Sequence, residues 1–260
     1  GDCAGGGVAA EEAAGCRAHH RPTSAEQALG EDKNFQPSTK EMRSRRLRVL
    51  IASGPTREPI DPVRFLSNYS TGLMGRCLAV EALRRGHRVR VVSGPTSVPL
   101  PRGARVVWVE QAQQMQQALR TQARWADALI MAAAVCDFKP IVRRATKLPR
   151  RGRLRLALQA TPDIVGSLPR RAGQVRVGFA LETGPFARAT ARSAAKLMAK
   201  RLDLIVGETM NGQTPFGKHP VQAFLVHRTG EMRRLGMVSK PRLAHAILDE
   251  VERLWKNQRA

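Results

Sequence analysis

Short apolar runs alternate with longer segments of helical spacing along most of the chain. The run at 47–53 (LRVLIAS) ends in Gly-Pro and has the length and flanking residues of a buried strand. Apolar residues then recur at helical spacing over 71–85, and Gly86 stands where a glycine commonly ends a helix. The same reasoning predicts strands at 88–93, 104–109 and 128–134 and a helix at 112–124. This strand–helix–strand order predicts crossover connections and a parallel sheet.

The second half of the chain continues the alternation less regularly. It predicts strands at 154–159, 175–181 and 203–206, helices at 161–168, 186–201 and 240–255, and a hairpin of strands 221–227 and 231–236 joined at 228–230. Thr161 is the predicted N-cap of the helix at 161–168. Together the elements predict an α/β fold, a three-layer α/β/α sandwich whose mainly parallel, Rossmann-like sheet carries an antiparallel edge hairpin.

A change of texture near position 47 divides the chain. Residues 1–46 show no sustained apolar period, so we expect a disordered or loosely attached tail there. Residues 47–260 form the one predicted domain. Hydrophobic residues make up 42% of the chain and aromatic residues only 4%, so the core must be aliphatic. An aliphatic core suits parallel strands that are covered by helices on both faces.

The formal net charge of +23 lies outside this tail, because residues 1–46 hold seven basic and seven acidic side chains. Such a charge attracts polyanions, including nucleic acids and nucleotides. Much of it comes from scattered Arg-Arg pairs, and the aromatic residues that stack on bases are scarce. We therefore read most of the charge as general surface, and a basic nucleic-acid-binding α/β protein stays as an alternative.

The cysteines and the apolar runs bear on the compartment. The four cysteines form no CxxC pair and show no metal-ligand spacing, which predicts reduced thiols and a cytoplasmic protein. No run of 18 apolar residues occurs, so we expect no membrane-spanning segment. The amino terminus has neither the basic nor the apolar region of a signal peptide. It also lacks Met, so we expect either a processed chain or a piece of a longer protein.

The segment after the first predicted strand is the first candidate binding site, because ligands of open α/β sheets bind beyond the carboxyl ends of the strands. Residues 54–72 contain three prolines, carry Arg57, Arg64 and Asn68, and lead into a helix N-terminus, where anions bind. The segment holds neither GxxxxGK[ST] nor GxGxxG. The absence of these motifs argues against a P-loop and against a Rossmann-type NAD(P) oxidoreductase.

Four motifs resemble those of the phosphopantothenoylcysteine synthetases. The first reads GPTREPIDPVR at 54–64 and SNYSTG at 67–72, and it matches the opening motif of that family nearly residue for residue. The others are AAAVCDF at 132–138, TPDIV at 161–165 and GFALET at 178–183. The resemblance covers residues 47–255.

The resemblance implies an α/β/α fold, a homodimer and a two-step ligase reaction of coenzyme A synthesis. The carboxylate of 4′-phosphopantothenate attacks the α-phosphorus of CTP, which gives an acyl-cytidylate and pyrophosphate. The amine of L-cysteine then displaces CMP. Charge neutralisation and positioning suffice for this chemistry, with Mg²⁺ accompanying CTP, so no protein nucleophile is needed.

The resemblance also implies the site residues. Nucleotide contacts fall on Ala132, Ala133, Asp137, Pro162, Asp163, Ile164, Val165 and Phe179, with Lys147, Lys196 and Lys200 near the phosphates. Substrate contacts fall on Arg64, Asn68, Ser70 and Thr71, and the catalytic candidates are Asn68 and Lys147. No protein side chain is assigned to a metal. Without the resemblance, Phe179 would be read as core and the lysines as solvated surface.

Two stretches depart from the family pattern. Lys147 to Arg150 read KLPR where the family has KxKK, and Glu208-Thr209 replace an Asn-Asp pair. These departures keep a non-catalytic relative as an alternative. Many bacterial members are fused behind a flavin-dependent decarboxylase, and residues 1–46 are too short for that domain. We therefore expect the decarboxylase on another chain or missing from this sequence.

Overall fold

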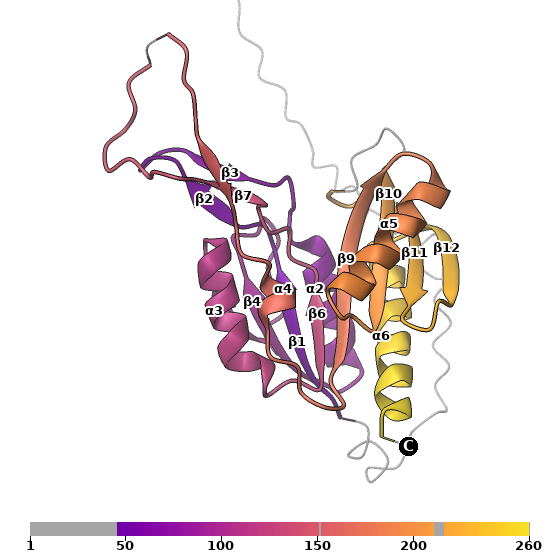
Figure 1. Cartoon of the computed structure of the whole chain (residues 1–260). Helices are drawn as coiled ribbons and strands as arrows, with labels where there is room; N and C mark the ends of the chain where they lie inside the picture. The colour runs from indigo at the N-terminus through magenta and orange to yellow at the C-terminus, as the bar shows by residue number, and fades with distance from the viewer. Residues whose placement is uncertain (1–45, 151, 211–215, 260) are drawn as a thin grey trace, which may run out of the picture. The chain divides into compact units, whose positions relative to one another are not determined.

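The computed structural model describes residues 46–150, 152–210 and 216–259 (Figure 1). The predicted tail at 1–46 lies outside this part of the chain except for Arg46. No helix in the described part is long and apolar enough to cross a membrane.

One eight-stranded sheet organises the fold, in the order β12-β11-β10-β9-β6-β1-β4-β5. The strands are β1 (Arg48–Ser53), β4 (Arg88–Ser93), β5 (Arg105–Trp108), β6 (Ala128–Met131), β9 (Val175–Thr183), β10 (Leu204–Met210), β11 (Val221–His227) and β12 (Met232–Val238). The six strands from β10 to β5 are parallel, whereas β11 and β12 run antiparallel at one edge. The predicted mainly parallel sheet with an antiparallel edge hairpin is confirmed.

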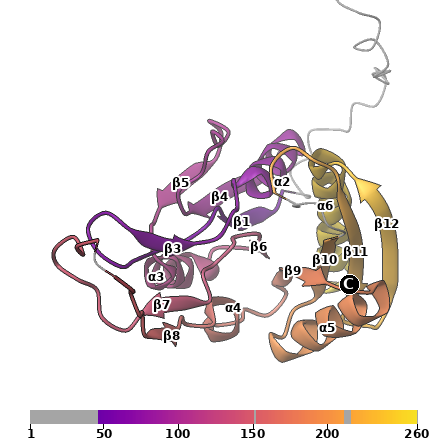
Figure 2. The ribbon, with the colours of Figure 1, turned by 90° about the horizontal axis from the view of Figure 1, so that it is seen from above.

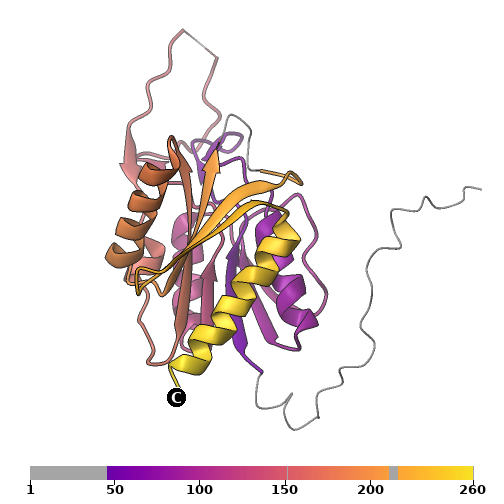
Figure 3. The ribbon, with the colours of Figure 1, turned by 90° about the vertical axis from the view of Figure 1, so that its right-hand side faces the viewer.

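Helices cover both faces of this sheet (Figures 2 and 3). They are α2 (Leu73–Arg84), α3 (Ala112–Ala123), α4 (Ile164–Ser167), α5 (Phe186–Ala199) and α6 (Lys240–Asn257). Helices α2 and α6 lie on one face over an aliphatic core, and α3, α4 and α5 lie on the other over two further apolar clusters. The mainly aliphatic core that the composition predicted therefore lies between the layers of an α/β/α sandwich.

Two glycines fix the position of α2. The helix ends where Gly86, with φ of 78°, lets its own N–H donate to Leu83 and the N–H of His87 donate to Ala82. This confirms the helix end predicted at Gly86. Near the other end, a Cβ on Gly75 would overlap the Ser53 side chain, so glycine allows α2 to lie directly against β1.

Two short hairpins were not predicted. They are β2 (Arg57–Pro59) with β3 (Phe65–Ser67), and β7 (Phe138–Pro140) with β8 (Leu158–Ala160). Of the strand predicted at 154–159, only the end forms β8, so that prediction is largely wrong. Residues 152–157 belong to an exposed arm that joins β7 to β8 (Figure 1), where alternating apolar residues meet no sheet.

Other boundaries also differ. Strand β6 is shorter than predicted, and β10 continues to Met210. The predicted cap at Thr161 is wrong, because α4 begins at Ile164 with Asp163 as its N-cap. The hydroxyl of Thr161 instead donates to Cys136 O at 2.7 Å and holds the segment that follows β6.

The order of the parallel strands places a switch point beside β1. From β1 the chain passes outward through β4 to β5, and then returns to β6 on the opposite side before it continues to β9 and β10. At such a point the connections diverge to opposite faces and leave a crevice at the carboxyl ends of the strands. The candidate site lies there.

Candidate functional site at the carboxyl end of the sheet

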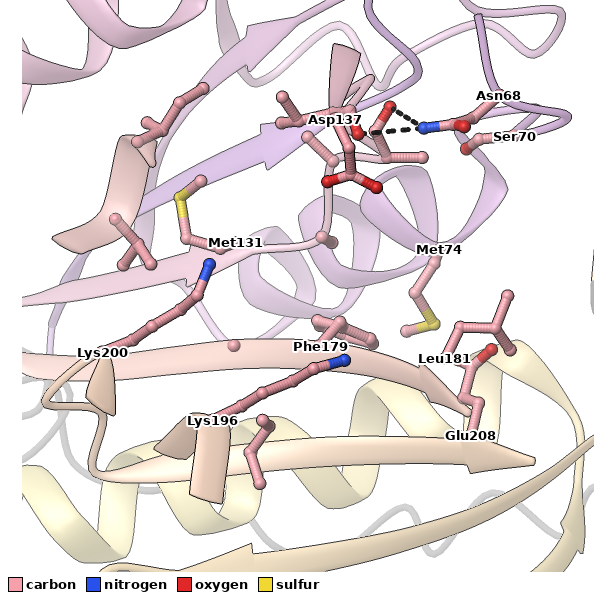
Figure 4. A pocket seen from close by; sticks show the side chains of 18 of the residues that line it. Asn68, Ser70, Met74, Met131, Asp137, Phe179, Leu181, Lys196, Lys200 and Glu208 are labelled. Atoms are coloured by element: carbon pink, nitrogen blue, oxygen red, sulfur yellow. Dashed lines mark hydrogen bonds between the residues drawn. The ribbon is translucent and has the colours of Figure 1, made fainter. Parts of the chain in front are cut away.

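A cavity of about 730 Å³ opens at this crevice (Figure 4). Its walls come from the segments before α2 and after β6, from β9 and β10, and from α4, α5 and the start of α6. It brings together all of the predicted site residues except Arg64 and Lys147. Those residues are Asn68, Ser70, Thr71, Ala132, Ala133, Asp137, Pro162, Asp163, Ile164, Val165, Phe179, Lys196 and Lys200.

The amino end of α2 forms one wall. Its N-cap is Gly72, in the left-handed conformation with φ of 79°, and no acidic residue lies in the first turn. Ser70 and Thr71 accept the N–H groups of Gly72 and Leu73 at 3.3 and 3.4 Å. The positive end of the helix dipole therefore faces the cavity without a carboxylate of its own, which favours a bound anion.

Asn68 joins the two segments that border this wall. Its Nδ2 donates to Ala134 O at 3.1 Å and to Val135 O at 3.0 Å (Figure 4). Because an amide nitrogen has two N–H bonds, both are directed at the protein. Asn68 thus ties the segment after β3 to the segment after β6. To donate to a ligand, Asn68 must first give up one of these two hydrogen bonds.

Two lysines, one in α5 and one that directly follows it, lie on the opposite wall. Lys196 Nζ lies 2.6 Å from Glu182 Oε1, and Lys200 Nζ lies 3.1 Å from Asp163 Oδ1. Glu182 is buried and also lies 3.7 Å from Arg192. Both ammonium groups are therefore held beside the cavity by carboxylates, and a polyphosphate would compete with these partners.

Small and apolar side chains form the floor. Ala132 and Ala133 follow the end of β6, where they leave room for a flat group against the backbone. Phe179 projects from β9 into the cavity between the two sides (Figure 4). Asp137 is exposed and presents a carboxylate near Asn68. A planar base with a ribose hydroxyl group fits such a combination of ring, small residues and acceptor.

The cavity also includes Glu208 and Lys240. Burial raises the pKa of Glu208, and the Lys240 ammonium opposes this rise. Burial lowers the pKa of Lys240, and Glu208 and Cys77 oppose that change. Lys240 was missed in the sequence, although a lysine in the first turn of a helix opposes the helix dipole and is a signal of an unusual environment.

Arg64 and Lys147 lie outside the cavity lining. The Arg64 guanidinium donates to Leu148 O at 2.5 Å and lies 3.3 Å from Asp61 Oδ2. Asp61 in turn accepts the N–H of Leu148 at 3.1 Å. These contacts attach the β7–β8 arm to the turn between β2 and β3. Lys147 is exposed on the arm beside this attachment. Neither side chain lines the cavity of this chain, and the ligand contacts predicted for Arg64 and Lys147 stay predictions.

Two residues of the opening motif, Thr56 and Glu58, stabilise the loop after β1 and do not line the cavity. Thr56 Oγ1 accepts the N–H of Cys136 at 2.9 Å, and Glu58 Oε1 accepts the N–H of Ala112 at 2.8 Å at the start of α3. Both side chains are buried. Their side-chain hydrogen bonds satisfy backbone groups that would otherwise be buried without a partner.

The comparisons with known proteins agree with this architecture. A family model described as the DNA/pantothenate metabolism flavoprotein C-terminal domain matches residues 44–254. The chain belongs to this family. One relative in it, the coenzyme A biosynthesis bifunctional protein CoaBC of Bacillus subtilis, is 38% identical over 212 residues, which cover 80% of this chain and 52% of the relative. The chain thus spans about half the length of the curated relatives it matches.

Two solved structures extend the comparison. The C-terminal domain of CoaBC superposes with a TM-score of 0.66 at 30% identity, over 81% of this chain and 96% of that domain. The Cab2 mutant H337A, in complex with phosphopantothenate-cysteine, gives a TM-score of 0.66 at 17% identity over 85% of this chain and 91% of Cab2, which shows a shared fold. The chain therefore shares its fold with both of these solved structures.

Proposed function

We propose that this chain is a ligase of coenzyme A synthesis that joins 4′-phosphopantothenate to L-cysteine at the expense of CTP. The observation that carries the proposal is the single cavity that gathers a helix N-terminus, two lysines, Asp137 and Phe179. This set suits a nucleotide beside a second anion. The likeness to almost the whole CoaBC C-terminal domain supports the same reading.

The first step of the proposed reaction brings two anions together. The carboxylate of phosphopantothenate attacks the α-phosphorus of CTP, the bond to the β-phosphate oxygen breaks, and pyrophosphate leaves. The amino end of α2 and the ammonium groups of Lys196 and Lys200 offset this charge. The protein contributes by binding and in-line positioning, because the attacking group belongs to the substrate.

The nucleotide-binding wall supports a cytidine nucleotide in this proposal. Phe179 offers a ring face to the base, Asp137 offers an acceptor to a ribose hydroxyl or an amino group, and Ala132 and Ala133 leave the backbone accessible. We expect Mg²⁺ to enter with the phosphates, because Mg²⁺ is usually bound through substrate phosphates and one or two carboxylates. The described residues contain no group of three or more His, Cys, Asp or Glu side chains that could hold a metal ion.

We also propose that two copies of the chain pair through the hairpins and the arm. Large apolar side chains are exposed there, with Tyr69 exposed by 89% and Val63 by 59%. The remaining exposed apolar residues of this surface are Phe65, Phe138, Ile141, Val142, Leu154, Leu156 and Leu158. Exposed large apolar side chains that concentrate on neighbouring hairpins and one arm favour a protein–protein contact there. Lys147 lies on the same arm, so arm movement or a second copy must bring it to a cavity.

Two wider expectations complete the proposal. The relatives are named bifunctional and the chain spans about half of their length, so the flavin-dependent decarboxylase belongs to another chain or to a part outside this sequence. We place the ligase reaction in the cytoplasm, as the reduced cysteines predict.

The experiment that tests the proposal measures pyrophosphate release from CTP and phosphopantothenate, with and without cysteine, beside the formation of phosphopantothenoylcysteine. We expect the dipeptide-like product only when all three substrates are present. If the wild-type chain forms neither pyrophosphate nor product with CTP or ATP, the ligase proposal is wrong and the non-catalytic relative is the better account.

A further inference from the structure

One end of the cavity holds two side chains of opposite charge. Glu208 extends from β10 next to its register partner Leu181 of β9, and Figure 4 shows both near Met74 of α2. Lys240 is the first residue of α6 and also lines the cavity, and its Nζ donates to Gly217 O at 2.9 Å. Three segments that are distant in the sequence thus meet around this pair.

The pair is electrostatically coupled inside the protein. Burial raises the pKa of the Glu208 carboxyl, and the charge of Lys240 acts in the opposite direction. The Cys77 thiol of α2 also contributes to the environment of Lys240. A carboxylate in such surroundings is a stronger base than one exposed to water, and it attracts a cation that enters the cavity.

The other acidic residues of the cavity have different surroundings. Asp163 caps α4 and binds Lys200, and Asp137 is exposed. Among the described lining residues there is no histidine. Glu208 is therefore the lining group best suited to take a proton from a ligand in the cavity.

The proposed ligase reaction requires such a group, and the inference rests on that reaction. At neutral pH the amine of an amino acid is mostly protonated, and an ammonium has no lone pair for attack on the acyl-cytidylate. We propose that Glu208 receives the ammonium of the amino-acid substrate and accepts a proton from it before amide formation.

The step balances within the proposed chemistry. Glu208 takes one proton from the ammonium. The nitrogen lone pair then forms the C–N bond to the acyl carbon, and the bond from that carbon to the bridging oxygen breaks. CMP leaves with that electron pair, and its phosphate takes the proton that the nitrogen loses as the amide forms. No oxidant or further reactant is required.

The test separates the two half-reactions in the Glu208→Gln variant, which keeps the size of the side chain and removes the base. We expect pyrophosphate release without cysteine to stay at the wild-type rate. Formation of phosphopantothenoylcysteine should fall by about 100-fold or more, the usual contribution of a general base. Hydroxylamine is largely unprotonated at neutral pH, so it should trap the acyl-cytidylate as a hydroxamate at the wild-type rate.

Glu231→Gln is the matched control, because Glu231 is exposed at the β11–β12 turn and does not line the cavity. It should leave every rate unchanged. An equal loss with cysteine and hydroxylamine in Glu208→Gln, or no loss with cysteine, would overturn the proposed role of Glu208. Absence of pyrophosphate release in the wild-type chain would instead overturn the ligase reaction itself.

Melting curves check that the variant folds. If Glu208→Gln does not fold, the ratio of cysteine product to hydroxamate is measured in Glu208→Asp, which keeps a carboxylate on a shorter side chain. The proposal predicts a ratio below that of the wild type, because the carboxylate no longer reaches the same point. An unchanged ratio would overturn it.

Discussion

Lys200 Nζ and Asp163 Oδ1 lie 3.1 Å apart on the cavity wall, and the same carboxylate oxygen accepts the Gly166 N–H at 3.3 Å and caps α4. One oxygen therefore serves both a lysine assigned to the phosphates and the start of a helix that lines the cavity. A phosphate that draws Lys200 away leaves Asp163 bound to α4 alone.

Lys200→Ala should weaken CTP binding by roughly 1.5–3 kcal/mol, the value of a charge-assisted hydrogen bond. Folding should change little, because the Lys200–Asp163 ion pair is largely exposed. Calorimetric titration with CTP measures the first effect and thermal melting the second. Lys256→Ala, at the far end of α6, is the control. Normal CTP affinity in Lys200→Ala would show that this lysine is a solvated surface residue without a role in CTP binding.

Two variants of Asn68 test separately its hydrogen-bond donors and the importance of its neutral side chain. Asn68→Ala removes the bonds to Ala134 and Val135, and Asn68→Asp also places a carboxylate against those carbonyl oxygens. We expect both to bind CTP and to form less phosphopantothenoylcysteine. The Asp variant should be the slower, because its charge also repels an acyl phosphate. A wild-type rate of product formation in Asn68→Asp would show that the residue has no catalytic part.

The proposed preference for CTP rests on the wall formed by Asp137, Phe179 and the turn at 162–165. We therefore expect kcat/KM to be much higher with CTP than with ATP, measured as pyrophosphate release under identical conditions. Equal values would contradict the nucleotide preference and leave the ligase proposal intact.

The exposed apolar arm predicts a dimer that charge can break. Ile141→Asp combined with Val142→Asp should shift the chain from dimer to monomer, measured by light scattering at several concentrations. Both side chains are more than half exposed within the single chain, so the substitutions should not disturb its core. Met198→Asp, at an equally exposed site on α5, should leave the assembly unchanged. A dimer that persists in the double variant would exclude this surface.

The contact between α2 and α6 predicts an acid-sensitive stability. Hydrogen bonds from Arg84, Arg85 and His245 lower the pKa of Glu81 to about 2, although burial opposes this change. A lowered carboxyl pKa stabilises the fold above the usual value of 4.5, and this contribution is lost as the pH falls toward 2. Glu81→Gln should therefore melt below the wild type at pH 7, with a difference that shrinks between pH 4.5 and 2. A difference that is independent of pH would contradict the assignment.

The sequence predicted those elements whose side chains have one buried face. Strand β1 and helix α2 show clear apolar spacing, and both formed close to their predicted bounds. Hairpins β2–β3 and β7–β8 were missed because strands of only three residues are too short to carry a periodic signal. The run at 154–159 has the alternating apolar pattern of a strand, but most of it lies on an exposed arm and pairs with no sheet.

The site was predictable as far as motifs reach. All of the site residues that the motifs indicated line the cavity except Arg64 and Lys147. The motifs could not show which of their residues stabilise loops instead of lining the cavity. Arg64, which was predicted to contact the substrate, lies outside the cavity lining and binds Asp61 and Leu148. Lys240 was missed because only the tertiary fold brings the start of α6 beside β10.

The attachment of the arm depends on the backbone rather than on side chains of the arm. Asp61 accepts the N–H of Leu148, and Arg64 donates to the C=O of the same residue. Every amino acid except proline offers both groups at that position. The arm can therefore accumulate substitutions on either side of position 148 and keep its anchor. The unusual KLPR run at 147–150 illustrates this tolerance, since its proline falls one residue beyond the anchored one.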